Sequence, residues 1–249
     1  MPVLGSVAGT CGFGRQQAQS DGAPTGLLIS LDASNSASYG GSGTTWTDTV
    51  SGYNGTLTNG PLFTNTAPKY FTFDGTDDYV NIADNSAIRP SIGGAVTAIV
   101  WAYVTSYVAF DGLISKMFGS PSYDGFSLLL NTNNVVTLKM NGGSVDGTYN
   151  SANNAFSLNT WTMFTVIPRF GGGSGNQSKV YVNATEVVSA ANGESSITVN
   201  TAPLRFPSGI QEASPYPACR IGSFYYYNRA LSASDINTLF TTTRTRFGV

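Results

Sequence analysis

A succession of short apolar segments separated by turn residues is the feature that most limits how this chain can fold. About a dozen such segments run from residue 25 to residue 229, and three of the longest are VTAIVWAYVT (96–105), WTMFTVIPRF (161–170) and CRIGSFYYYNR (219–229). Clusters of Gly, Asn, Asp and Ser separate them at the short spacing typical of all-β proteins. The pattern predicts an all-β, two-sheet antiparallel sandwich or barrel and argues against alternating βαβ units.

The last apolar segment contains three consecutive tyrosines. Successive side chains of a strand point to opposite faces of its sheet. We therefore expect Tyr225 and Tyr227 to share one face and Tyr226 to lie on the other, with rings on both sides of the sheet.

One short helix is predicted after this strand, over residues 231–241. Ser232 stands three residues before Asp235, which is the spacing of a capping box with Asp in place of Glu. Arg229 leaves the strand close to this point, so we expect an ion pair with Asp235 that contributes at most about 1 kcal/mol when exposed.

The charge content excludes several classes of function. Charged residues make up only 10% of the 249 residues, the net charge is −2, and no basic stripe is present. Nucleic-acid binding is therefore not expected. No apolar run reaches the length of a membrane span, and the N-terminus lacks the basic and apolar regions of a secretory signal.

Residues 1–25 form an extended N-terminal arm in this interpretation, and residues 26–249 form the sandwich domain. The arm is rich in Gly, Ser and Gln, and its spaced apolar residues are candidates for assembly contacts: Val3, Leu4, Val7 and Phe13. The chain has two cysteines, Cys11 and Cys219. They are either two free thiols or a bridge between the arm and the last strand.

Five segments in order resemble one family: FDGTDDYV (73–80), TAIVWAYV (97–104), LNTWTMFTV (158–166), KVYVNATEVV (179–188) and YNRALSASDI (227–236). Together they resemble the laminin-G-like, concanavalin A-like lectin/glucanase domains, in the three-segment form of bacterial and phage proteins. The resemblance implies a jelly-roll sandwich of two curved antiparallel sheets over about residues 26–240.

Two positions depart from the pattern of that family. Gly222-Ser223 stands where the family often has Asp-Glu in the last strand. Asn183-Ala184 stands where the family usually has Asn-Gly at a hairpin. Because Ala fits positive φ poorly, we expect a longer turn at this hairpin.

The carboxylates do not predict catalysis. A glycosidase of this class needs two carboxylates that face each other across the substrate. The chain has three Glu, which stand apart in the sequence: Glu186, Glu194 and Glu212. Histidine is absent, which removes Ser-His and Cys-His arrangements. We expect a protein that is not an enzyme.

Three carboxylates in FDGTDDYV are the candidate metal ligands: Asp74, Asp77 and Asp78. Carboxylate oxygens suit Ca²⁺, and the resemblance implies that one calcium ion is bound in many such domains. The alternative is that these side chains shape a tight turn through hydrogen bonds to backbone N–H groups. No other cofactor is expected.

Aromatic residues in the predicted loops are candidates for stacking on sugar rings: Trp46, Tyr53, Tyr107, Phe110, Tyr123 and Tyr216. The alternative for each is a lid over the edge of the core. Trp101 and Trp161 lie inside apolar runs and are predicted core residues.

The sequence favours a non-catalytic structural or adhesion protein on a phage or virus particle, such as a tail fibre, tip or capsid decoration. Its expected partners are other particle proteins, further copies of itself in a homo-oligomer, and cell-surface glycans. The expected location is a virion or an extracellular surface. The alternatives are a secreted carbohydrate-binding lectin and, less favoured, a glycosidase.

Overall fold

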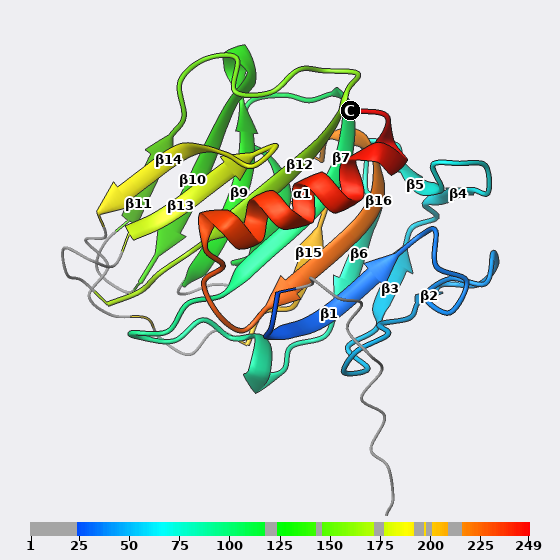
Figure 1. The fold of residues 1–249 in the computed structure, drawn as a ribbon, viewed down its shortest axis with the longest axis horizontal. Coiled ribbons are helices and arrows are strands. Elements are labelled where there is room, and N and C mark those ends of the chain that lie inside the picture. The colour runs from blue at the N-terminus through cyan, green and yellow to red at the C-terminus, as the bar shows by residue number, and fades with distance from the viewer. Residues whose placement is uncertain are drawn as a thin grey trace, which may run out of the picture.

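The computed structural model describes residues 24–117, 124–142, 146–171, 177–191, 197, 201–208 and 216–249. These residues form two antiparallel sheets packed face to face, with a helix on the outside of one of them (Figure 1). The predicted two-sheet sandwich with one C-terminal helix is confirmed. The arm, with Val3, Leu4, Val7, Phe13 and Cys11, lies outside the described residues.

We call the two sheets A and B. Sheet A contains β1 (Leu27–Asp32), β4 (Leu62–Thr64), β5 (Tyr70–Phe73), β7 (Thr97–Ser106), β12 (Trp161–Ile167), β13 (Gln177–Val182), β14 (Thr185–Ala191) and β16 (Ala218–Tyr227). Its described strands follow the order β14-β13-β12-β7-β16-β5-β4, and β1 also pairs with β16.

Sheet B contains β2 (Thr45–Trp46), β3 (Gly55–Thr58), β6 (Tyr79–Ile82), β8 (Asp111–Lys116), β9 (Gly125–Asn131), β10 (Val135–Asn141), β11 (Asp146–Asn150) and β15 (Leu204–Phe206). Its described strands follow the order β11-β10-β9-β8-β15-β6-β3-β2. Two single-turn 3₁₀ helices, η1 (Ser86–Ile88) and η2 (Thr132–Asn134), lie in the connections.

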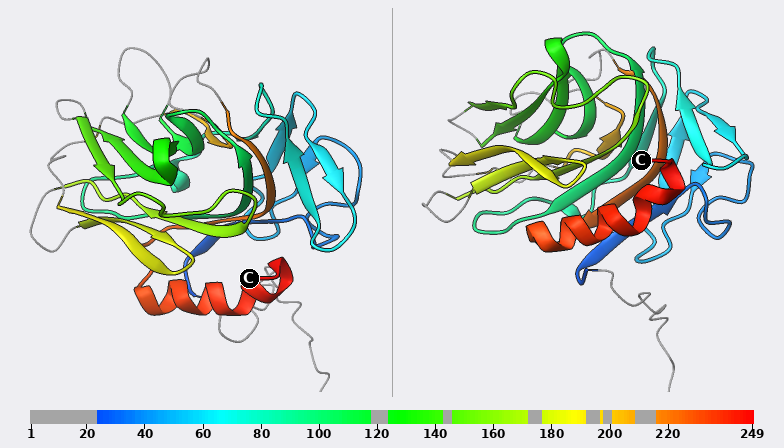
Figure 2. Two further views of the ribbon diagram at one scale, coloured as in Figure 1. Left: turned by 90° about the horizontal axis from the view of Figure 1, so that it is seen from above. Right: turned by 45° about the horizontal axis from the view of Figure 1, so that its top comes forward.

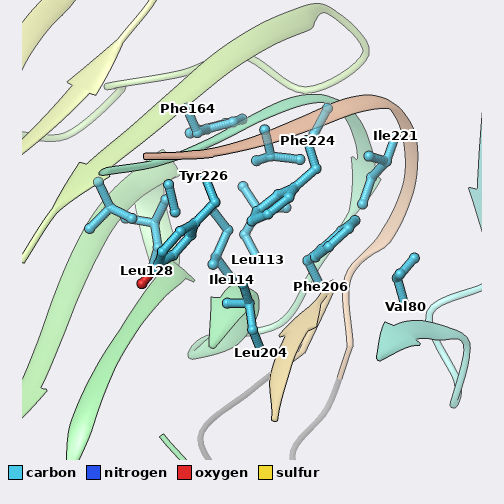
Figure 3. Close-up of a cluster of buried hydrophobic side chains, with 14 of the residues drawn as sticks. Val80, Leu113, Ile114, Leu128, Phe164, Leu204, Phe206, Ile221, Phe224 and Tyr226 are labelled. Atoms are coloured by element: carbon cyan, nitrogen blue, oxygen red, sulfur yellow. The ribbon is translucent and has the colours of Figure 1, made fainter. Parts of the chain in front are cut away.

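The main core lies between the two sheets (Figure 3). Phe206 of β15 and Phe224 of β16 stack across the sandwich, with ring centroids 4.2 Å apart and planes 9° from parallel. Tyr226 points into the same core, and its buried hydroxyl donates a hydrogen bond of 2.8 Å to the carbonyl of Ile88. Cys219 is buried in this core and forms no disulfide within the described residues.

A second apolar cluster lies on the outer face of sheet A, under α1 (Ala233–Phe247). Figure 2 shows the helix outside the two sheet layers. Trp101 and Trp161 are buried as predicted, but in this outer cluster rather than between the sheets. Tyr227 also lies in it and Tyr225 packs against it, so the predicted alternation of the three tyrosines is confirmed.

The helix is longer than the predicted 231–241. Its start is as expected: the Ser232–Asp235 capping box is present, and Arg229 pairs with Asp235 at 3.0 Å. It continues to Phe247 through a threonine-rich stretch of modest helix propensity. Trp101 Nε1 donates a hydrogen bond of 3.0 Å to Thr243, so packing on sheet A extends the helix where local propensity would end it.

The expectation of a longer turn at Asn183-Ala184 is wrong. The two residues alone connect β13 to β14, with φ of 47° and 65°. The backbone N–H of Asn183 donates to the carbonyl of Met163, and its side-chain oxygen accepts from the N–H of Met163, both at 2.9 Å. These bonds to β12 hold the turn and offset the roughly 1–2 kcal/mol that a left-handed residue such as Ala184 costs.

Gly222 explains one departure from the family pattern. A Cβ on Gly222 would lie 2.5 Å from Cε1 and 2.8 Å from Cζ of Phe247. The ring of Phe247 also contacts Trp101 and Trp161, with centroids 4.4 and 4.7 Å apart. The end of α1 therefore occupies the space that a side chain at position 222 would need.

We expect Gly222→Ala to lower the free energy of unfolding by roughly 1–3 kcal/mol, because the added methyl overpacks against Phe247. Phe247→Ala alone should cost about 3–5 kcal/mol, and the double variant should cost less than the sum of the two. Urea unfolding measures all three values. Gly40→Ala is the control, because a Cβ there has nothing within 4 Å. A neutral Gly222→Ala, or strict additivity, would contradict this packing.

Candidate functional site

A row of polar side chains crosses the outer face of sheet B. Cross-strand pairing places one residue from each of seven neighbouring strands in this polar row: Thr56, Asn81, Arg205, Ser115, Ser127, Lys139 and Thr148. Directly paired residues share a face of the sheet. Alternate residues of the same strands, such as Val80, Leu204 and Leu128, point into the core, so the polar row faces outward.

Hydrogen bonds link neighbours within the polar row. Arg205 Nε donates to Asn81 Oδ1 at 2.9 Å, and Lys139 Nζ donates to the hydroxyl of Thr148 at 3.2 Å. Ser115 and Ser127 are buried in the middle of the row, and their hydroxyls lie 2.6 Å apart. The accessible part of the row lies on either side of this buried pair, and there Asn81, Arg205 and Lys139 present amide, guanidinium and ammonium groups on a rigid sheet.

Two tyrosines flank the polar row beside Arg205. The guanidinium carbon of Arg205 lies 4.8 Å from the centre of the Tyr79 ring. The Tyr216 ring is stacked on Tyr79, with centroids 6.1 Å apart and planes 12° from parallel. Cation–π contact and stacking fix the guanidinium in place, and the half-buried Tyr79 gives the row an aromatic side.

The row ends at an open groove. Thr148, the last residue of the row, lines a groove of about 570 Å³ together with Tyr149, Asn150 and residues 187–190. The groove lies between the edge strands β11 and β14.

The candidate aromatic residues within the described part of the chain are not brought together. Trp46 is fully buried against Phe71, with ring centroids 4.6 Å apart. The prediction that Trp46 stacks on a sugar is therefore wrong: pairing of β2 with β3 turns its side chain into the core. Of the five candidates that the structure describes, Tyr216 is the one that lies beside the polar row.

The remaining candidates have other surroundings. Tyr53 and Tyr107 pack against the edge of the core, as the lid alternative predicts, and the hydroxyl of Tyr107 donates to the carbonyl of Asn131 at 2.9 Å. Phe110 is 52% exposed, and no ring contact joins it to Tyr79 or Tyr216 among the described residues. Tyr123 lies outside the described residues.

The three aspartates lie together in the connection between β5 and β6. Ligand atoms of Asp74, Asp77 and Asp78 are within 4.8 Å of one another. Asp78 Oδ2 accepts a hydrogen bond of 3.1 Å from the N–H of Asp74, and Asp74 Oδ1 accepts one of 2.7 Å from the N–H of Thr76. Such hydrogen bonds from backbone N–H groups to carboxylates are what the alternative of a tight turn predicts.

Comparison with known proteins identifies the family. A laminin G family model, described as the concanavalin A-like lectin/glucanases superfamily, matches residues 74–237, which is more than half of the chain. The chain belongs to the concanavalin A-like lectin/glucanase superfamily. The resemblance drawn from the sequence is confirmed. A sequence search of curated proteins finds no significant match.

Solved structures share the fold of this superfamily member at low sequence identity. The binding domain of Paraclostridial Mosquitocidal Protein 1 is 18% identical with a TM-score of 0.67, and the match covers 87% of this chain and 52% of that one. A botulinum neurotoxin type C structure, from work on cell entry dependent upon two ganglioside molecules, is 20% identical with a TM-score of 0.64, covering 87% and 51%.

A third similar structure is the binding domain of botulinum neurotoxin DC in complex with SialylT. It is 17% identical with a TM-score of 0.63, and the match covers 88% of this chain and 52% of that one. The chain thus spans about half the length of the structures that it matches. At these identities the likeness establishes a shared fold.

The superfamily includes both lectins and glucanases, so the glutamates of this chain are candidates for catalytic carboxylates. Glu186 accepts hydrogen bonds from Lys179 Nζ at 2.7 Å and from the Tyr181 hydroxyl at 2.9 Å. The bond from Lys179 contributes most to lowering the pKa of Glu186, whereas a general acid needs a raised pKa. Glu194 and Glu212 lie outside the described residues.

A buried ion network was missed from the sequence. Lys116 has no exposed surface, and its Nζ donates to Asp84 Oδ1 at 2.9 Å and to the carbonyl of Ala202 at 2.6 Å. Asp84 also accepts from Arg89 Nε at 2.9 Å. Burial raises the pKa of Asp84, but hydrogen bonds from Arg89 and Lys116 outweigh it and hold this pKa below its ordinary value. The network ties β8 to the connection after β6.

The polar row was missed for a physical reason. Asn81, Arg205 and Lys139 each stand between two apolar residues in their strands, which marks them as outward-facing. That signal is readable from the sequence. The alignment of seven strands that places them in one line depends on long-range pairing, which the alternation within one strand does not specify.

Burial, and then the charges of Asp74 and Asp77, raise the pKa of Asp78. For an acid whose pKa is higher in the folded state, ionisation costs stability above that pKa, and the cost disappears as the group protonates. We therefore expect Asp78→Asn, which keeps an acceptor for the N–H of Asp74, to raise the melting temperature at pH 7. The gain should shrink toward pH 3.5. An unchanged or lower melting temperature at pH 7 would contradict this.

Melting curves of the wild type and of Asp78→Asn, with and without calcium, distinguish the turn hypothesis from the calcium hypothesis. If the three carboxylates bind calcium, a hundredfold excess over Kd stabilises the wild type by about 2.7 kcal/mol. Asp78→Asn should lose most of that gain. If they only shape the turn, neither calcium nor a chelator shifts the melting temperature of either protein.

Proposed function

We propose that this domain is a non-catalytic carbohydrate-binding module and that a glycan binds at the Asn81–Arg205 part of the polar row of sheet B. The observation that carries the proposal is the cross-strand alignment of hydrogen-bonding side chains, held rigid by Arg205–Asn81 and flanked by Tyr79. A sugar offers many hydroxyls and weakly apolar ring faces. Fixed amide and guanidinium groups beside an aromatic edge match both.

Two further observations support this proposal. The groove at the Thr148 end gives the row a second open surface, beyond the buried serines. The similar structures include proteins studied with gangliosides and with SialylT, although the shared fold alone does not assign their ligands to this chain.

Binding without catalysis is favoured over glycoside hydrolysis. Asn, Arg, Ser, Lys and Thr make up the polar row, and none of these side chains supplies the pair of carboxylates that hydrolysis requires. Glu186 lies on β14 of sheet A, engaged by Lys179 and Tyr181. A secreted lectin and a particle-bound lectin would use the same surface.

Asn81→Ala should weaken binding of the best glycan from an array about tenfold, since a lost polar contact costs roughly 1–2 kcal/mol. Lys179→Ala, on sheet A, is the control and should bind as the wild type does. Titration calorimetry measures the affinities, and melting curves verify the fold. An array without a ligand, or equal weakening in both variants, would reject the polar row as the site.

We further propose that the module is displayed on a phage or virus particle and anchored through residues 1–25. The support comes from the sequence: the arm carries spaced apolar residues in a Gly- and Ser-rich segment, and the domain is poor in charge. Other particle proteins and further copies of the chain would be its partners.

Deleting residues 1–24 should leave the melting temperature nearly unchanged but prevent incorporation into the particle. The reason is that the arm has too little apolar surface to offset the roughly 1–2 kcal/mol per residue of ordering it alone. Co-purification with assembled particles is the measurement. If the shortened protein assembles normally, the anchoring role is lost, and a large drop in stability would indicate an arm packed on its own domain.

A further inference from the structure

The outer face of sheet A is only partly covered by its helix. In Figure 1, α1 crosses β12, β7 and β16, and its last residue, Phe247, contacts Trp161. Beyond that point, cross-strand pairing aligns five residues on the same outer face: Trp161, Tyr103, Arg220, Thr72 and Leu62. Leu62 is 72% exposed, and Tyr103, Arg220 and Thr72 are half-buried.

Arg220, in the middle of these five aligned residues, is held between two aromatic rings. Its guanidinium carbon lies 4.8 Å from the centre of the Tyr103 ring and 5.1 Å from that of Tyr70. Each ring attracts the cation through the negative potential of its face. Among the described residues, the guanidinium has no carboxylate partner and no hydrogen bond, and neither do the two tyrosine hydroxyls.

Other arginines of the domain differ in this respect. Arg246 pairs with Asp32 at 2.6 Å, and Arg229 pairs with Asp235 at 3.0 Å. Arg89 is likewise paired, with Asp84. An arginine fixed by aromatic rings but not by an acid keeps its N–H donors available, and the planar guanidinium fork matches a carboxylate in two parallel hydrogen bonds.

The rings around Arg220 are themselves braced. Trp161 contacts both Tyr70 and Tyr103, with centroids 5.7 Å apart in each case. Trp161 in turn packs on Phe247 at the end of α1. A ligand that binds here therefore meets side chains already in position, which reduces the entropy cost of binding.

We propose that Arg220, Tyr70 and Tyr103 form a binding site for the carboxylate of an acidic sugar, such as a uronic acid. Arg220 takes the carboxylate, and the two tyrosines offer hydroxyls and ring edges to the sugar ring. The site lies on sheet A, on the opposite side of the sandwich from the polar row. It does not depend on the polar row and can be tested separately.

Glucuronate and glucose are the matched probes, because they share a ring and differ in the carboxylate. Titration at low ionic strength, followed by the NMR signals of the Tyr70 and Tyr103 rings, should show glucuronate binding at least about tenfold tighter than glucose. Acetate should bind more weakly than glucuronate. Glucose 6-sulfate shows whether a sulfate replaces the carboxylate.

Two substitutions of Arg220 test its role. Arg220→Met should abolish the preference for glucuronate, and Arg220→Lys should retain only part of it, because a lysine keeps the charge but loses the fork. Asn81→Ala, in the polar row, should leave glucuronate binding unchanged. Melting curves verify that each variant folds.

Four results would overturn the proposal. They are equal affinity for glucose and glucuronate, equal affinity for acetate and glucuronate, preference for glucose 6-sulfate, and ring signals of Tyr70 and Tyr103 that do not move. These four comparisons use the wild-type protein, so the test stands even if an Arg220 variant does not fold.

Discussion

Strand β16 contributes side chains to both hydrophobic clusters of the domain. Its side chains alternate, so that Phe224 and Tyr226 enter the core between the sheets while Tyr225 and Tyr227 face α1. The strand also pairs with β7 along its length, with β5 at its start and with β1 at its end. A loss of register in β16 would exchange the two sets of rings between the faces, so the sandwich and the helix depend on the same pairing.

The end of the helix packs where one residue of this strand lacks a side chain. Gly222 has no side chain, and Phe247 fills the space beside it. The helix ends there. It therefore covers the part of the outer face around Tyr227 but does not reach Arg220, which lies two residues from Gly222 along the same strand. The outer face of sheet A therefore has two parts. The helix covers the apolar part, and Arg220 lies with Tyr70 and Tyr103 in the part that the helix leaves uncovered.

Local signals in the sequence predicted the elements, and long-range pairing determined the surfaces. The capping box at Ser232 and the alternation of Tyr225–Tyr227 are properties of neighbouring residues, so they were readable. The turn at Asn183-Ala184, the burial of Trp46 and the length of α1 were misjudged because contacts with distant residues decide them. For the same reason the polar row was missed, although each of its members stands out in its own strand.

The two proposed surfaces have a consequence for how the domain would engage glycans. They lie on opposite outer faces of a sandwich whose sheets are about 10 Å apart, before the side chains on each face are added. A short oligosaccharide bound at the polar row cannot also reach Arg220, so the two sites would bind separate chains. A domain that holds one glycan-bearing surface through Asn81 and Arg205 would leave Arg220 directed away from it, toward a second one. If both proposed sites bind glycans, the domain would bridge two surfaces rather than bind a single chain more tightly.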